Sequence, residues 1–212
     1  MANYAYALCD EATRACLLVD PAWHPLELVA LLEDGQWRVE GCVLTHFHAD
    51  HAGGRLFGTL AVAGVAELLA ERDLPIHAQA DEIAWLCNGT GLEPGAFVAH
   101  RPGDVLACGA GEVVLVHTPG HTPGSQCLFS GDNLLTGDTL FLDGCGRSDL
   151  PGGDPHALHD SLTRRLRGIP GATRVYVGHA YARDRFATMD ELRARNAVLA
   201  PLTEQEWLAR FA

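Results

Sequence analysis

The sequence predicts an α/β fold in which short strands alternate with helices, and two observations support this prediction. Short apolar or β-branched runs recur along the chain, and Gly, Pro, Asn or Asp residues end them, as is typical of buried strands. The longer segments between these runs carry apolar residues with helical spacing. With 212 residues, of which 48% are hydrophobic, the chain can bury a sizeable core within one domain.

The first half of the chain is predicted to contain both strands and helices. The strands span about 4–9, 15–20 and 41–45, and the helices span about 25–33, 60–72 and 80–87. Residues 61–72 are rich in helix formers with apolar spacing. Because this segment borders a histidine-rich loop, it either walls a substrate cleft or packs as a plain helix.

The second half is predicted to be richer in strands. Strands are expected at about 113–117, 126–130, 133–136 and 173–177, and helices at about 155–167, 189–199 and 203–211. Thr203 and Glu206 have the spacing of a capping box, in which each side chain bonds a backbone N–H of the other residue. The last helix should therefore begin at this point.

The stretch Thr45–Gly54 holds three histidines and one aspartate within six residues, directly after the apolar run 41–44. A long helix would spread these side chains over several faces, and a strand would send Asp50 and His51 to opposite faces. A tight loop at a strand end can bring all four to one point. Imidazole and carboxylate are together the ligand set of zinc, iron or manganese, so His46, His48, Asp50 and His51 predict a metal site.

Three more residues stand in the same setting, namely His121, Asp138 and His179. Each follows a short apolar or β-branched run and has Gly or Pro beside it. Such positions are typical of the ends of buried strands. We therefore expect several strand ends to deliver ligands to one edge of the sheets.

The other histidines are predicted to lie outside the metal site. His117, in the strand that leads to the His121 loop, either supports a ligand from behind or packs as an ordinary strand residue. The histidines without a strand-end setting are expected to be solvated: His24, His77, His100, His156 and His159.

The seven cysteines include no CxxC pair. Cys16, Cys42 and Cys127 lie in apolar runs and are expected to be buried thiols, which fits a reducing compartment. Cys145 is interpreted as a small loop residue rather than an oxidation-sensitive one.

The net charge of −12 argues against nucleic acid and acidic membrane surfaces, whose phosphates need basic patches. The chain shows no apolar run of about 18 residues free of charge, and its N-terminus lacks a basic region followed by an apolar stretch. We expect a cytoplasmic protein with neither a nucleic-acid nor a membrane partner. The oligomeric state is not predicted.

These motifs resemble the metallo-β-lactamase superfamily in their order, HxHxDH and then His121, Asp138 and His179. THFHADHAGG, TPGHTPGS, GDTLFLDGCGR and VGHAY are most similar to glyoxalase II (hydroxyacylglutathione hydrolase) and to its sister family, the persulfide dioxygenases. The resemblance covers nearly the whole chain. It implies a four-layer αβ/βα sandwich, with two mixed β-sheets face to face and helices outside, formed by residues 1–212 as a single domain.

The resemblance also implies a role for each candidate ligand. The first metal site matches His46, His48 and His121, the second matches Asp50, His51 and His179, and the bridging carboxylate matches Asp138. The expected cofactors are two divalent metal ions, with zinc as the first choice and iron or manganese as alternatives. A persulfide dioxygenase would instead hold one iron through His46, His121 and Asp138.

A binuclear site of this kind implies hydrolysis by a metal-bound hydroxide. Two divalent ions can lower the pKa of a bridging water from about 15.7 to about 7, and they also polarise a carbonyl and stabilise the oxyanion. A thiolate leaves without strong acid assistance, so no Ser or Cys nucleophile is required. The predicted catalytic residues are Asp138, as the bridge, and Asp50, which can orient or deprotonate the water.

Two residues are candidates for substrate binding. Arg147 matches the basic position by which glyoxalase II holds a glutathione carboxylate, and a guanidinium suits this bidentate contact. The alternative for Arg147 is an ion pair with Asp149. Tyr181 matches a substrate-binding tyrosine of that family, and its alternative is core packing.

The chain departs from glyoxalase II in two places. Only residues 180–212 follow the last ligand, too few for the helical C-terminal domain that completes the glutathione site, so we expect that domain to be absent and glutathione specificity to be in doubt. GCGR continues with Ser148 and Asp149, closer to the persulfide dioxygenases and to short hydrolases, whereas residues 52–54 and 150–154 are more similar to the hydrolases.

The predicted function is a metal-dependent hydrolase of a small thioester, similar to a hydroxyacylglutathione, or of a related ester. The main alternative is a mononuclear iron dioxygenase that acts on glutathione persulfide. Lactonase or β-lactamase activity and a non-catalytic metal-binding module are remoter alternatives.

Overall fold

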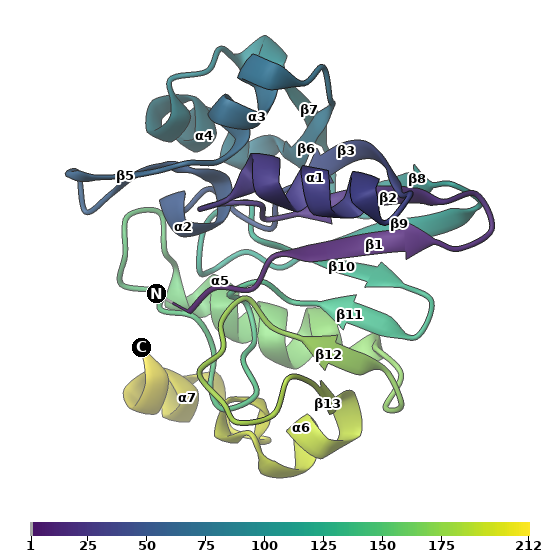
Figure 1. The fold of residues 1–212 in the computed structure, drawn as a ribbon. Helices are drawn as coiled ribbons and strands as arrows, with labels where there is room; N and C mark the ends of the chain where they lie inside the picture. The colour runs from purple at the N-terminus through teal and green to yellow at the C-terminus, as the bar shows by residue number, and fades with distance from the viewer. Residues whose placement is uncertain (1) are drawn as a thin grey trace.

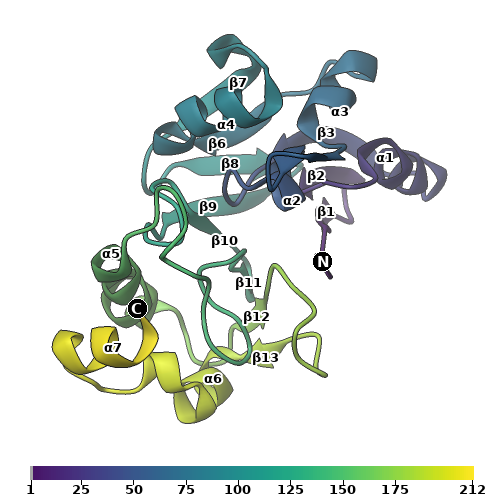
Figure 2. The same ribbon diagram turned by 90° about the vertical axis from the view of Figure 1, so that its left-hand side faces the viewer.

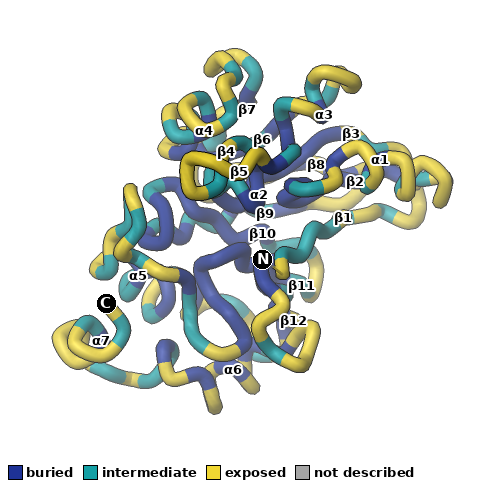
Figure 3. The backbone as a smooth tube through the Cα atoms, turned by 60° about the vertical axis from the view of Figure 1, so that its left-hand side comes forward, coloured by how far each residue is buried: buried dark blue, intermediate teal, exposed yellow. Residues whose placement is uncertain are grey.

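The computed structural model describes residues 2–212 and shows two β-sheets packed face to face, with helices on their outer surfaces (Figure 1). This arrangement confirms the predicted α/β sandwich. Buried chain segments gather along the middle of the molecule, while the helices keep exposed outer faces (Figure 3).

The first sheet has the strand order β1-β2-β3-β6-β7. Its strands are β1 (Tyr6–Asp10), β2 (Ala15–Val19), β3 (Arg38–Val43), β6 (Ile76–Gln79) and β7 (Phe97–His100). Only the β1–β2 pair is antiparallel, and the others are parallel. The helices α1 (Pro25–Asp34), α3 (Val65–Glu71) and α4 (Ile83–Thr90) lie on its outer face. They cover apolar residues that include Leu18, Leu44 and Ile76.

The second sheet has the order β13-β12-β11-β10-β9-β8. Its strands are β8 (Val105–Cys108), β9 (Gly111–His117), β10 (Gln126–Ser130), β11 (Asn133–Leu135), β12 (Arg174–Tyr176) and β13 (Ala187–Thr188). Only β11 and β12 are parallel, and the other neighbouring strands are antiparallel. The helices α5 (Pro155–Asp160), α6 (Met189–Arg195) and α7 (Glu204–Phe211) cover its outer face. The fully buried Trp207 of α7 belongs to the same apolar cluster as Leu134 and Val175 of this sheet.

Leu17 and Val19 of the first sheet pack between the sheets against Leu115 and Leu128 of the second. The short helix α2 (Ala49–Ala52) leads into a two-stranded ribbon of β4 (Gly54–Leu56) and β5 (Leu60–Val62). Among residues 2–212, no helix has the length and apolar character needed to span a membrane.

Several predicted boundaries are wrong for local physical reasons. The predicted helix 60–72 begins as β5, because Leu60–Val62 pairs with β4, and α3 starts only after Gly64. The predicted helix 155–167 is α-helical only to Asp160 and continues as a π-helical turn, Ser161–Arg165. The strands β6, β7 and β8 were not predicted, because each has only four residues and gives a weak local signal.

The predicted helix 189–199 ends at Arg195 because Asn196 uses its side chain elsewhere. Asn196 Nδ2 donates to Phe141 O at 2.9 Å, and Asn196 Oδ1 accepts from Gly144 N at 3.1 Å. These bonds fasten the 141–147 loop to the C-terminal part of the chain. The predicted start of the last helix is confirmed, since Thr203 and Glu206 form the capping box of α7.

Candidate metal centre

The seven predicted ligands come from the segments that follow β3, β9, β11 and β12. In Figure 2 the viewer looks onto the side of the sandwich on which α2 and these loops lie. His46 follows β3, His121 follows β9, Asp138 follows β11 and His179 follows β12, each within a few residues of the strand end. The predicted ligands therefore lie just beyond strand ends, on one edge of the sheets.

The cluster after β3 differs from the expected loop in one respect. Asp50 and His51 lie in α2, a single helical turn whose N-cap is His48. His51 N and Ala52 N both donate to His48 O at 2.9 Å. One turn is too short to spread the side chains around a helix, so the four ligands still converge.

Six of the predicted ligands form two groups whose donor atoms lie within 4.8 Å of one another, namely His46, His48 and His121, and Asp50, His51 and His179. In the first group, His48 Nδ1 lies 3.0 Å from His121 Nε2. In the second, His51 Nε2 lies 3.3 Å from His179 Nε2. All six are buried except the half-buried His48. We call these groups the first triad and the second triad.

Asp138 lies between the two triads. Its Oδ2 is 3.7 Å from His121 Nε2 of the first triad and 3.1 Å from His179 Nε2 of the second. Its Oδ1 is 3.4 Å from His51 Nε2. This is the position that a carboxylate shared by two cations would occupy.

The donor atoms fit a divalent metal. His46 Nε2 and Asp138 Oδ1 are buried and have no hydrogen-bond partner among the described residues, which is costly unless another group satisfies them. Burial, with the neighbouring imidazoles, holds the pKa of His46 well below its usual range, and burial lowers that of His48 to about 4. Both rings are therefore neutral at pH 7 and can donate a lone pair.

His51 has a different electrostatic setting. Burial lowers its pKa, but the carboxylates of Asp138, Asp20 and Asp50 outweigh that effect and raise it to about 9. A positive charge is thus stabilised at the point where the three carboxylates meet, as a divalent cation would be.

Asp20, which was not among the predicted site residues, orients two of the ligands. Its Oδ1 accepts from Thr45 N at 2.8 Å, and its Oδ2 accepts from Thr45 Oγ1 at 2.6 Å and lies 3.0 Å from His51 Nδ1. Thr45 Oγ1 lies 3.0 Å from His46 Nδ1 and, since its proton goes to Asp20, accepts there. Nε2 of both His46 and His51 is then left to face the site.

Asp20 also groups spatially with His46 and His51, but both of its oxygens are already used, so its role is to orient rather than to ligate. A sequence signal existed. Asp20 directly follows the buried strand β2 and precedes Pro21, the same setting as the predicted ligands His121, Asp138 and His179.

Arg147 contacts the site through its backbone. Its carbonyl oxygen lies 2.6 Å from His121 Nδ1, and Gly146 packs so closely that a Cβ there would be 2.9 Å from the same nitrogen. The guanidinium instead pairs with Asp149, at 2.8 Å and 2.7 Å, and both side chains are more than 60% exposed, at 68% and 64%. The ion pair named as the alternative is therefore present.

Tyr181 is not a core residue. Its side chain is 63% exposed, so the core-packing alternative is wrong. The ring stacks on His179, with centroids 4.7 Å apart and planes 2° apart, and meets the edge of Phe141 at 5.4 Å. Tyr181 thus lies at the mouth of the second triad.

Glu82, also missed from the sequence, ties a neighbouring element to the His121 loop. It ends the 3-10 helix η1 (Ala80–Glu82), and its Oε1 accepts from Thr122 Oγ1 at 2.8 Å and from Gly124 N at 2.6 Å. The side chain is buried, which raises its pKa to about 7.

The remaining histidines follow the prediction only in part. His24 and His156 are exposed, as expected. His77 Nδ1 instead lies 2.9 Å from His100 Nε2, and half-buried His159 packs 5.5 Å from the ring of Trp207. His117 Nε2 donates to Pro123 O at 3.0 Å, so it braces the His121 loop from behind.

The cysteines agree with the prediction. Cys16, Cys42 and Cys127 are buried, and all seven cysteines are free thiols. Cys145 is half-buried in the 141–147 loop, and burial raises its pKa to about 12, as expected of an unreactive loop residue.

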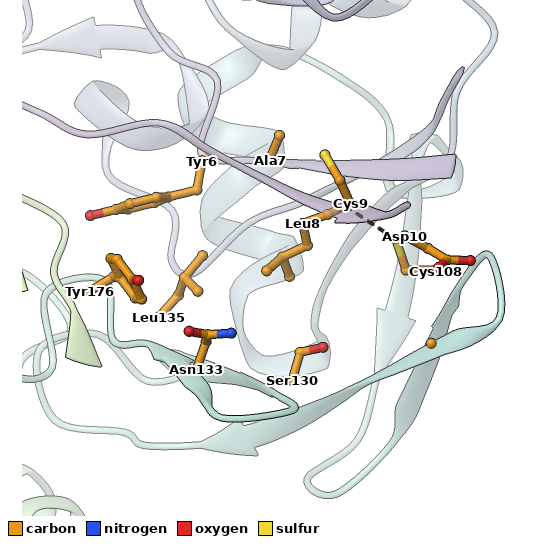
Figure 4. A pocket seen from close by; sticks show the side chains of 11 residues that line it. Tyr6, Ala7, Leu8, Cys9, Asp10, Cys108, Ser130, Asn133, Leu135 and Tyr176 are labelled. Carbon is orange, nitrogen blue, oxygen red and sulfur yellow. Dashed lines mark hydrogen bonds between the residues drawn. The ribbon is translucent and has the colours of Figure 1, made fainter. Parts of the chain in front are cut away.

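A cavity of about 460 Å³ lies away from the metal centre (Figure 4). It opens between β1 of the first sheet and β11 and β12 of the second, and its lining includes Tyr6, Asn133 and Tyr176. None of the seven predicted ligands lines it. It is therefore separate from the site described above.

The Asp20 network leads to a prediction about metal affinity. Asp20→Asn should weaken metal binding at both triads by about 10–100-fold, because it disturbs the orientation of His46 and of His51. Thr45→Val is the matched variant and should weaken the first triad more than the second. Competition with a chelator measures the metal affinity of each triad. If Asp20→Asn binds metal at both triads as tightly as wild type, the assigned role is contradicted.

Glu82 leads to a prediction about stability and pH. Its folded-state pKa of about 7 exceeds the ordinary 4.5, so the stability it contributes is complete below pH 4.5 and is lost as pH rises through 7. At 1.36 kcal/mol per pKa unit, wild type should lose about 3 kcal/mol relative to Glu82→Gln between pH 4.5 and 8. Urea unfolding at several pH values measures this, and parallel stability curves would contradict it.

Comparison with known proteins agrees with the geometry. The family described as the metallo-beta-lactamase superfamily matches residues 2–179. A hydroxyacylglutathione hydrolase from Gloeobacter violaceus is 33% identical over 220 residues, covering 95% of this chain and 79% of that protein. A probable polyketide biosynthesis zinc-dependent hydrolase, BaeB of Bacillus velezensis, is 27% identical over 210 residues, covering 99% of this chain and 86% of its own length.

Among solved structures, ETHE1 from Myxococcus xanthus superimposes with a TM-score of 0.81 at 28% identity, covering 98% of this chain and 84% of that one. The relatives and the two triads together support an enzyme that uses a divalent metal. Because the family match spans most of the chain and contains all seven predicted ligands, the chain belongs to the metallo-β-lactamase superfamily.

Proposed function

We propose that this protein hydrolyses a thioester, or a related ester, with two divalent metal ions, most simply zinc. The observation that carries the proposal is the position of Asp138, whose oxygens lie within 3.7 Å of donor atoms from both triads. The similarity to a hydroxyacylglutathione hydrolase supports the thioester, and the similarity to a zinc-dependent hydrolase supports zinc.

The metal ions, when bound, would lower the pKa of water at the site and polarise the substrate carbonyl. His46, His48 and His121 would hold one ion, Asp50, His51 and His179 would hold the other, and Asp138 would contact both. The second oxygen of Asp50 is then free to orient the attacking water or to take its proton. A thiolate leaving group needs no strong acid to assist its departure.

The substrate is proposed to lie between Tyr181 and Arg147. Tyr181 presents an exposed ring beside His179, where it can pack on an acyl group. The Arg147–Asp149 pair is exposed and therefore weak, so the guanidinium can exchange Asp149 for a substrate carboxylate. A cavity of about 430 Å³ adjoins Arg147 and is lined by residues 143–147, 195–198 and Phe211, which supports a site for the tail of the substrate.

We also propose that the 212 residues form one domain and act in the cytoplasm. The helices α6 and α7 pack on the second sheet through Leu192 and Trp207 instead of forming a separate unit. Seven free thiols fit a reducing compartment.

A second candidate function is an iron-dependent oxidation of glutathione persulfide with one metal per chain. The GCGRSD motif and the likeness to ETHE1 favour it. Oxygen consumption by the iron-loaded protein on addition of glutathione persulfide would support this function over hydrolysis, and its absence would exclude it.

The bridging role predicts a specific loss of metal. Asp138→Asn should lower the metal content of the purified protein from two ions per chain to about one and reduce thioesterase activity by about 100-fold or more, since even indirect metal contacts are worth 10–100-fold. Elemental analysis and hydrolysis of S-lactoylglutathione measure these effects. Asp160→Asn, at the end of α5 and outside both triads, is the control and should change neither.

One metal per wild-type chain, with no thioesterase or esterase activity after loading with zinc or manganese, would contradict the proposed function.

Arg147 predicts a dependence on the substrate's carboxylates. Arg147→Gln should raise KM for a glutathione thioester about 10-fold, with kcat nearly unchanged, because the charge-assisted hydrogen bonds to the carboxylate are lost in the ground state and the transition state alike. KM for a thioester without carboxylates should not change. Arg164→Gln is the matched control, because Arg164 is also an exposed arginine paired with an aspartate, Asp160, and it does not line the cavity beside Arg147. An equal rise of KM for both substrates would contradict carboxylate binding.

A further inference from the structure

Asn3 lies directly against the second triad. Its Nδ2 donates to Asp50 Oδ2 at 2.9 Å and lies 3.3 Å from His51 Nε2. Its backbone forms a β-bridge with His179. Asn3 therefore contacts every member of the second triad, whereas no hydrogen bond within residues 2–212 joins it to the first.

The backbone holds Asn3 in this place. Tyr4 N donates to Gly178 O at 2.9 Å, and Ala180 N donates to Ala2 O at 2.8 Å. Residues 2–4 therefore run antiparallel to residues 178–180, the segment that carries His179. The start of the chain and a ligand loop near its end thus form one unit over the second triad.

The chemistry of the amide determines which of its ends faces Asp50. A carboxylate only accepts hydrogen bonds, so the NH₂ end must face it, and the reverse orientation would place two acceptors together. The bonded oxygen, Asp50 Oδ2, lies 3.5 Å from His179 Nε2 and 3.7 Å from His51 Nε2. The amide thus holds the oxygen that faces the other donors of the triad.

The other end of the amide is unusual. Asn3 Oδ1 is buried and has no hydrogen-bond partner within the described part of the chain. Leaving a buried acceptor unpaired is costly. The amide nevertheless keeps the orientation in which Nδ2 donates to Asp50. This indicates that the contact with Asp50 determines how the amide is oriented.

We propose that Asn3 is a positioning residue that holds Asp50 in the orientation needed for the second metal ion, the one assigned to Asp50, His51 and His179. This inference rests on the proposed function, because it requires two ions. A carboxylate ligand can rotate about its side-chain bonds, and a hydrogen bond to the oxygen that faces the metal restricts this rotation before the metal binds. Asn3 itself touches no reacting atom.

The test compares the two ions within one protein. In Asn3→Leu, the side chain keeps a similar volume but loses the donor, while in Tyr4→Phe the neighbouring residue changes and the contact with Asp50 remains. Increasing chelator removes zinc from each zinc-loaded protein, and the two ions are resolved by their separate affinities. In Asn3→Leu the affinity for the second ion should fall about 10–100-fold and that for the first should be unchanged.

Tyr4→Phe should match wild type at both ions. At saturating zinc, Asn3→Leu should lower kcat for a thioester more than it raises KM, because Asn3 acts through Asp50 and does not contact the substrate.

Two outcomes would overturn the inference while leaving the proposed function intact. In the first, wild type binds two ions and Asn3→Leu binds both with unchanged affinity. In the second, Asn3→Leu weakens both ions equally, which would show that residues 2–4 only support the fold. Wild type that binds a single ion would instead refute the binuclear function, and the role of Asn3 with it.

Discussion

The burial of charged and polar groups at one edge of the sheets is the constraint on which the site depends. Asp20, Asp50 and Asp138 are buried together with four histidines, and isolated buried carboxylates are strongly unfavourable. The rise in the pKa of His51 shows that this environment stabilises a positive charge. A divalent cation carries more charge than a proton and binds more donor atoms. The arrangement of these buried groups is therefore set by the need to bind a metal, whichever reaction the metal supports.

The fold satisfies this constraint through close backbone approach. A Cβ on Gly146 would contact His121, and one on Gly137 would lie 2.6 Å from Thr45 Oγ1, so glycine lets the ligand loops meet. Asn196 fastens the loop that carries Gly146, and Glu82 fastens the loop that carries His121. Residues remote from the donors thus determine where the donor atoms stand, as expected for a site that needs preorganised geometry.

Much of this site could be predicted from the sequence because two local signals point to its residues. The density of His and Asp after β3 predicts His46, His48, Asp50 and His51, and the setting of a polar residue at a strand end predicts His121, Asp138 and His179. Asp20 has the same setting but stands alone in sequence, so only its contacts with Thr45 and His51 show what it does. Asn3 and Glu82 carry no such signal, because their roles depend on contacts with residues 47 and 40 positions away.

The fold shows the same division between local and long-range information. Elements with a strong local signal, such as α1 and β10, lie where the sequence predicts them. The four-residue strands β6 and β7 were missed, because their strand conformation comes from pairing with strands distant in sequence, β3 with β6 and β6 with β7. The exposed pairing of Arg147 with Asp149 also needed coordinates, since the sequence favours neither partner.

The two triads differ in how the chain supports them, and this difference bears on how metal binding and folding are coupled. The first triad is braced from inside the sandwich, by Thr45 behind His46 and by a backbone carbonyl behind His121. The second joins α2 to residues 178–180, and the N-terminal segment closes over both. A ligand set drawn from such distant segments is brought together only when the chain is folded, so ion binding there contributes directly to folding stability. Both triads therefore need loops that other residues hold in place, and the second needs the N-terminal segment in addition, through the contact of Asn3 with Asp50 and its bridge to His179.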